Sequence, residues 1–184
     1  HPRLLDALEA LLGPELLCHP TQVVRPRIRD RDYSEDRRRT TDLTPWHQDS
    51  GFLRPEADNT TIVTAWIPFT RADEENGCLQ VIPGSHKSNL LHPVFAEGAE
   101  SLDEVPAAVE LPLKAGDAAC FVDCMAHGSA RRTNPGQRRV LIIRYGPHWG
   151  NDRYGFQPSP ELIARLTPAR RKIVQPLPPK VPPS

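Results

Sequence analysis

The stretch TTIVTAWIPF, from Thr60 to Phe69, is rich in Val, Ile, Thr and aromatic residues, the residue types that β-strands favour. Outward from it, short runs of the same kind recur: GCLQVIPG, AVELPL, DAACFVDC and RRVLIIRYG. Glycine-containing turn sequences lie between runs, such as EENG before Cys78 and KAGD before Ala118. Several short strands at this spacing predict an antiparallel sandwich or barrel.

Both ends of the chain are expected to be helical. PRLLDALEALLG has leucines at helical spacing, which predicts an amphipathic helix at residues 3–12 that covers a sheet. PSPELIARLTPARRKIV predicts a short helix from Pro160 to Leu166 and a second helical turn, before the proline-rich QPLPPKVPPS. We expect one domain over residues 1–184, with its barrel at about 20–147 and its C-terminal helix and tail at 148–184. Because the chain does not begin with Met, we expect the N-terminus of this domain to be incomplete.

The composition argues against two classes of partner. The 184 residues include 23 Lys and Arg and 23 Asp and Glu, so no overall charge attracts nucleic acid or an acidic membrane. No apolar run approaches the roughly 20 residues that span a bilayer. We therefore expect a cytoplasmic protein that binds neither nucleic acid nor membranes. The sequence does not indicate an oligomeric state.

Four cysteines stand in apolar, strand-like surroundings, at positions 18, 78, 120 and 124. Cys120 and Cys124 raise the alternative of a metal pair. CFVDC reads as a strand, however, where residues four apart lie too far from each other to chelate easily. We interpret all four as buried thiols.

A polar pair interrupts the apolar pattern in TPWHQDSGF, where His47 and Asp49 lie two residues apart. On a strand, side chains alternate, so these two point to one side while Trp46 and Gln48 point to the other. An imidazole and a carboxylate on one face can chelate a single ion, but a third ligand is needed. Two histidines and one carboxylate with open coordination positions form the site of non-haem Fe(II) oxygenases.

The third ligand must come from elsewhere among the seven histidines. His19 lies next to the N-terminal helical segment, and His86 lies in the turn-like PGSH, where a loop histidine bonded to its own backbone is an equally good interpretation. His127 stands apart, because it closes the predicted strand DAACFVDCMAH and is followed by the small residues GSA.

An arginine follows His127 at a suggestive spacing. Arg138 lies eleven residues later and opens RRVLIIRYG, so a short hairpin through RRTNPGQ would bring it beside His127 on the neighbouring strand. A guanidinium at that place is suited to binding a carboxylate through two hydrogen bonds.

Alternation along RRVLIIRYG predicts which side chains face inward. Val140, Ile142 and Arg144 share the face of Arg138, and Leu141, Ile143 and Tyr145 take the other. Arg144 would lie roughly 20 Å from Arg138, so we expect it at a barrel end, in a salt bridge or, as the alternative, near the substrate mouth. Trp66 is expected to pack in the core. Trp149, Asn151 and Tyr154 fall in a polar loop where a lid and plain packing are equally good interpretations.

The segments HQD, ENGCLQVIPGSH and HGS, followed by Arg138, occur here in an order that resembles the phytanoyl-CoA dioxygenase family of Fe(II)/2-oxoglutarate-dependent oxygenases. The resemblance runs from about Leu4 to Tyr145. It implies a mainly β fold with flanking helices, the double-stranded β-helix or cupin-like jelly roll.

The resemblance also implies roles by position. It matches the iron ligands to His47, Asp49 and His127, and the 2-oxoglutarate carboxylate anchor to Arg138. Ser129 matches a hydroxyl that assists this anchor, and Thr44 a position that contacts the co-substrate. Gln22 is the candidate for the family's lysine or glutamine on the strand before the HxD motif.

The implied activity is that of a dioxygenase using Fe(II), 2-oxoglutarate and O2, which hydroxylates or otherwise oxidises a C–H bond of a small organic molecule and releases succinate and CO2. Because Asp49 fills the position that a halide occupies in related halogenases, halogenation is not expected. Two other classes stay open: a non-catalytic metal-binding or sensing module, and a cupin-type isomerase or hydrolase using another divalent metal. The substrate is expected to be lipid-like or a secondary metabolite, or an acyl-CoA whose phosphates meet the arginines at 37–39.

Overall fold

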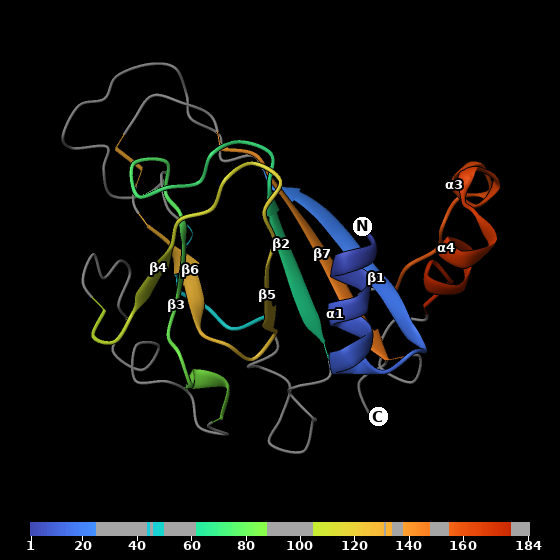
Figure 1. The fold of residues 1–184 in the computed structure, drawn as a ribbon, viewed down its shortest axis with the longest axis horizontal. Coiled ribbons are helices and arrows are strands. Elements are labelled where there is room, and N and C mark those ends of the chain that lie inside the picture. Colours follow the sequence, from blue (N-terminus) through green and yellow to red (C-terminus); the bar gives the residue numbers. More distant parts are fainter. Residues whose placement is uncertain are drawn as a thin grey trace.

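The computed structural model describes residues 1–24, 44, 46–49, 62–87, 105–130, 132–133, 138–147 and 155–177, apart from the side chains of 20 and 22–24. These residues form two antiparallel sheets (Figure 1). A four-stranded sheet has the order β1 (Leu16–Val24), β7 (Val140–Pro147), β2 (Val63–Pro68), β5 (Ala119–Val122). A three-stranded sheet has the order β4 (Val109–Leu111), β3 (Leu79–Val81), β6 (His127–Ser129). The predicted jelly roll is confirmed.

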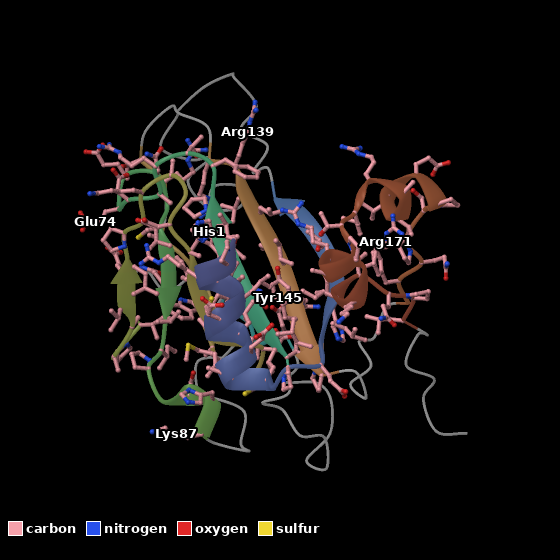
Figure 2. All side chains as sticks on the ribbon, turned by 45° about the vertical axis from the view of Figure 1, so that its right-hand side comes forward. His1, Glu74, Lys87, Arg139, Tyr145 and Arg171 are labelled. Carbon is pink, nitrogen blue, oxygen red and sulfur yellow. The ribbon has the colours of Figure 1, made fainter. Side chains whose placement is uncertain are left out.

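The four-stranded sheet is apolar on both faces, but each face packs against a different layer. Helix α1 (Pro2–Leu12) lies over β1 and β7 in Figure 1, and its buried Leu8 packs against the outer face. That face carries Val63, Ala65 and Tyr145, and Figure 2 shows Tyr145 beside the helix. The opposite face packs against the three-stranded sheet through a core cluster of Trp66, Leu79, Val81, Phe121 and Val140.

The predicted alternation on β7 is confirmed by this division. Ile142 packs against the inner cluster, whereas Ile143 and Tyr145 belong to the outer one. Strand register agrees, because Thr64 and Trp66 of β2 pair with Arg144 and Ile142 of β7. β7 itself begins at Val140, two residues after Arg138.

The chain changes sheets at Asp123, where the sequence predicted one continuous strand, DAACFVDCMAH. That prediction is wrong: β5 ends at Val122, a turn follows, and β6 begins at His127 in the other sheet. A hydrogen bond of 2.9 Å from the Met125 amide to the Val122 carbonyl closes the turn. Because β6 and β7 belong to different sheets, the predicted hairpin between His127 and Arg138 is also wrong.

Gly77 allows the close approach on which the arginine site depends. Its φ of 74° is in the region that favours glycine, as the EENG turn predicted. A Cβ here would lie 2.7 Å from both the Ala130 carbonyl oxygen and Cγ of Arg132, and 3.6 Å from an Nη1 atom of Arg138. Any larger residue would therefore push buried backbone or arginine side chains apart.

The termini largely follow expectation. The N-terminal helix extends one residue beyond the predicted range, and the barrel begins earlier than predicted, at Leu16. Two short C-terminal helices, α3 (Pro160–Arg165) and α4 (Pro168–Ile173), replace the predicted helix and turn. Each is capped by a hydroxyl, from Ser159 and Thr167 respectively, that accepts a hydrogen bond from a backbone amide.

The prediction of four buried thiols is only half right. Cys78 and Cys124 are buried, but Cys18 is partly buried and Cys120 is exposed. Cys120 lies on β5, the last strand of its sheet, and alternation turns it away from the buried Phe121. None of the four forms a disulfide.

Within the described part of the chain, no helix is long and apolar enough to cross a membrane. Several predictions fall outside that part: those on the arginines at 37–39, on Trp149, Asn151 and Tyr154, and on the proline-rich end beyond residue 177.

Candidate metal centre

His47, Asp49 and His127 lie close together, although the third is 78 residues from the second in sequence. One potential ligand atom from each lies within 4.8 Å of the others. Nε2 of His47 is 3.8 Å from Oδ1 of Asp49, and Nε2 of His127 is 3.8 Å from Oδ2. The two imidazole centroids are 4.2 Å apart. This spacing allows all three side chains to bind one ion.

Backbone hydrogen bonds bring the segment around His47 to β6. His47 and His127 form an isolated antiparallel bridge, with mutual amide-to-carbonyl bonds of 2.9 and 3.0 Å. The amide of Asp49 donates to the Asp123 carbonyl at 2.9 Å. His127 therefore has His47 on one side and Val81 of β3 on the other. Neither neighbour is Arg138, which the sequence predicted beside His127.

The side chains of this segment alternate as predicted, although the described part forms a bridge rather than a full strand. Nε2 of Gln48 points away from the three donors and donates to the Cys124 carbonyl at 2.6 Å. Trp46 packs against a small cluster of Ile82, Val105 and Ala126. These two anchors hold His47 and Asp49 toward the interior.

His127 is held in the form that binds a metal. Its Nδ1 lies 2.9 Å from the Met125 carbonyl, which can only accept, so Nδ1 carries the proton and the Nε2 lone pair is available. Burial, followed by the nearby His47, lowers the pKa of His127 to about 4. The imidazole is therefore neutral at physiological pH, as metal ligation requires.

Asp49 stays ionised despite its partial burial. Burial alone would raise its pKa, but the Arg144 guanidinium, with smaller effects from His127 and His47, holds the pKa of Asp49 below its ordinary value. Nη2 of Arg144 lies 3.1 Å from Oδ1 of Asp49 and 3.5 Å from Oδ2 of Asp123. The expected salt bridge of Arg144 is confirmed, and its partners are a candidate ligand and the turn that supports it.

Arg138 has a different environment. It is only 4% exposed, its Nη1 donates to the Gly77 carbonyl, and its Cζ lies 5.9 Å from the Trp66 ring centroid. Its Nε has no hydrogen-bond partner, and among the described residues no carboxylate forms an ion pair with it. Burial, followed by the charge of Arg132, lowers the pKa of Arg138 to about 10, so it remains a cation near neutral pH. A buried cation of this kind fits an anionic ligand.

Ser129 and Thr44 are neighbours. The Thr44 amide donates to Oγ of Ser129 at 2.6 Å, and the Ser129 amide donates to the Thr44 carbonyl at 3.0 Å. Ser129 lies two residues after His127 on β6, so both side chains share one face. Because Oγ of Ser129 already accepts, its own proton is available to donate to a ligand.

The other candidates are placed as follows. Gln22 lies on β1 opposite Ile142, but its side chain is outside the described residues, so its role stays a prediction. His86 lies in the 3-10 helix η2 (Ser85–Lys87) and does not belong to the three-donor group. His19, which the sequence placed next to the helical segment, is fully buried on β1 opposite Arg144.

Sequence reasoning missed Asp123. Its signal was a single acidic residue inside the apolar run AACFVDCMA, which is unusual for a buried strand. Its partner Thr64 donates to Oδ1 of Asp123 at 2.8 Å across 59 residues, a pairing that no local pattern contains.

Two imidazoles and one carboxylate brought together in a jelly roll are the donor set with which non-haem oxygenases bind iron. Residues 1–140 match the model of the phytanoyl-CoA dioxygenase (PhyH) family, and the chain belongs to this family. The resemblance seen in the sequence motifs is confirmed.

Individual relatives support this family assignment. The chain is 29% identical over 154 residues to the peroxisomal phytanoyl-CoA dioxygenase of Bos taurus, covering 78% of this chain and 43% of the relative. It is 28% identical over 200 residues to the ectoine dioxygenase of Bordetella parapertussis, covering 96% and 61%. Among solved structures, the nickel complex of the non-heme monooxygenase ThoJ is 28% identical with a TM-score of 0.57, covering 83% and 55%. The chain thus spans roughly half the length of these relatives.

Proposed function

We propose that the protein is an Fe(II)- and 2-oxoglutarate-dependent dioxygenase that hydroxylates, or otherwise oxidises, a C–H bond of a small organic molecule and releases succinate and CO2. The observation that carries the proposal is the convergence of His47, Asp49 and His127 within 4.8 Å. Bound Fe(II) and 2-oxoglutarate would supply the activation of O2.

Each residue has a role in holding these groups. His47, His127 and Asp49 would hold the iron, with His127 presenting a neutral Nε2 and Asp49 a negative charge. Arg138 would bind the distal carboxylate of 2-oxoglutarate, and the Ser129 hydroxyl would donate to the same group. Thr44, whose amide donates to Oγ of Ser129, would also contact the co-substrate. Gln22, on β1, is proposed as a further residue that binds the co-substrate.

The proposal for the substrate names a broad chemical class and no single compound. Relatives named for phytanoyl-CoA and for ectoine show that members act on chemically different small molecules. We propose a lipid-like or secondary-metabolite substrate, with an acyl-CoA as the alternative, and a cytoplasmic location.

The test begins with the full chain and Fe(II) under anaerobic conditions. Addition of 2-oxoglutarate should produce the visible absorption of its chelate with Fe(II), and exposure to air should then convert 2-oxoglutarate to succinate. His47→Ala should lose both signals because it removes a ligand, whereas Arg138→Ala should require far more 2-oxoglutarate.

Each alternative predicts a different outcome. A sensing module or a cupin-type isomerase or hydrolase would bind metal without forming either the chelate or succinate. If His47→Ala and Arg138→Ala convert 2-oxoglutarate as well as the wild type does, the proposed function is wrong.

A further inference from the structure

Arg144 lies at the inner face of β7, close to the candidate metal ligands but not among them. Strand register places it between Thr64 of β2 and His19 of β1, and only 6% of its surface is exposed. A guanidinium in such a position must be compensated by nearby anions, because burial of an uncompensated charge is costly.

Two carboxylates provide that compensation, from different segments. Nη2 of Arg144 lies 3.1 Å from Oδ1 of Asp49 and 3.5 Å from Oδ2 of Asp123. The same guanidinium nitrogen therefore links a metal-ligand candidate to the turn at which the chain changes sheets.

Asp123 is held by hydrogen bonds to its carboxylate, its amide and its carbonyl. It is 2% exposed, and Oδ1 accepts the hydroxyl proton of Thr64 at 2.8 Å. Its amide donates to the Ile62 carbonyl at 3.0 Å, and its carbonyl accepts from the Asp49 amide at 2.9 Å. Asp123 thus holds both the backbone of Asp49 and, through Arg144, the Asp49 carboxylate.

We infer that Arg144, anchored by Asp123, is a positioning residue that fixes the Asp49 carboxylate toward His47 and His127 for metal binding. The inference rests on the proposed metal site. Partners that hold metal ligands are known to change metal affinity by about 10- to 100-fold when they are removed.

The positive charge of Arg144, taken alone, predicts the opposite change in metal affinity when Arg144 is removed. A guanidinium next to the site repels a divalent cation, so its removal would strengthen metal binding if repulsion were its main effect. If positioning dominates, removal weakens binding, because the Asp49 carboxylate is free to rotate away from the two imidazoles. The direction of the change therefore separates the two effects.

The test is calorimetric titration of the full chain with Ni(II) and, under anaerobic conditions, Fe(II). Arg144→Met should weaken binding about 10- to 100-fold. Arg144→Lys keeps the charge, but its side chain is shorter and has no nitrogen at the Nη2 position between the two carboxylates, so this variant should also bind metal more weakly than wild type. Arg139→Met removes the same charge from an exposed side chain that projects from the end of the sheet (Figure 2), and should leave affinity unchanged.

A spectroscopic measurement distinguishes positioning from a general loss of stability. The visible spectrum of the Co(II)-loaded protein reports the ligand geometry, so Arg144→Lys should alter it while Arg139→Met should not. Tighter or unchanged metal binding in the folded Arg144 variants would overturn the inference. If Arg144→Met does not fold, Arg144→Lys decides alone. If the wild type binds no metal, the proposed function fails instead.

Discussion

Arg138 and Arg144 are six residues apart on the same face of one chain segment, and both are buried, yet their surroundings differ. Arg144 lies between the carboxylates of Asp49 and Asp123. Arg138 meets the Gly77 carbonyl and the Trp66 ring, and no carboxylate of the described residues pairs with it. One end of the barrel has its charges compensated internally, and the other has a cation that fits an anionic ligand.

The two environments favour different roles for the two ends of this chain segment. At the Arg144 end, buried charge organises the protein's own carboxylates. At the Arg138 end, burial without an opposite charge costs free energy that a bound carboxylate would recover. Variants of the two arginines should therefore behave in opposite ways.

Arg144→Met should destabilise the metal-free protein by about 3–5 kcal/mol, because it removes the guanidinium that pairs with the buried Asp123 and the partly buried Asp49. Urea unfolding followed by circular dichroism measures this loss. Adding Asp123→Asn to Arg144→Met should cost less than the sum of the two single changes, since they remove one interaction. Strictly additive losses would show that Arg144 and Asp123 are not coupled.

Lowering the pH should act through His127 while Arg138 stays charged. The pKa of His127 falls from an ordinary 6.5 to about 4 in the folded protein. The unfolded chain therefore takes up this proton at a higher pH than the folded one, and stability present above pH 6.5 is lost as the pH falls to about 4. The loss is on the order of 3 kcal/mol.

Urea unfolding of the metal-free protein between pH 7 and 4 tests this dependence. His127→Gln should remove the corresponding part of it, because glutamine does not titrate in this range. An identical pH dependence in the two proteins would show that His127 is not the group responsible.

Arg138→Met should leave the stability of the ligand-free protein unchanged or slightly higher, since a buried cation without a carboxylate partner is removed. The same change should weaken 2-oxoglutarate binding by about 1.5–3 kcal/mol, the usual range for hydrogen bonds to charged groups. Titration with 2-oxoglutarate in the presence of Ni(II) measures it. A large loss of stability without loss of 2-oxoglutarate affinity would show that Arg138, like Arg144, stabilises the fold and does not bind the co-substrate.

Thr64→Val should have the smallest effect, about 1–2 kcal/mol of stability, because one oxygen of the buried Asp123 loses its donor. The isosteric valine keeps the packing, so thermal unfolding reports mainly the lost hydrogen bond. Thr70→Val, at a partly buried threonine outside this network, serves as the control and should change stability less.

The sequence predicted the features that depend on short-range periodicity. Alternation placed His47 and Asp49 on one side of their segment and Ile142 and Ile143 on opposite faces of β7, because a strand has a period of two. The sequence did not predict that Asp123 ends a strand, since an apolar run looks the same whether it stays in one sheet or crosses to another. The Thr64 and Asp123 pair, 59 residues apart, has no local signature.

The exposed Cys120 illustrates the same limit. Its apolar neighbours on β5 predicted burial, but exposure depends on the position of the strand in the sheet, and β5 is at the edge. Similarly, the spacing of eleven residues identified Arg138 as a candidate, while the hairpin proposed to bring it near His127 does not exist. The motif identified the candidate residues, but their placement on different strands and sheets depends on long-range packing that the motif does not contain.

The central claim is that His47, Asp49 and His127 together bind one metal ion. Its most direct test is an anaerobic Fe(II) titration of wild type and of His127→Ala, with circular dichroism to verify the fold of each. We predict one ion per chain for wild type and a loss of that binding in the folded variant. Binding that is equally tight and equally stoichiometric without the His127 imidazole would show that the three side chains do not form one metal site.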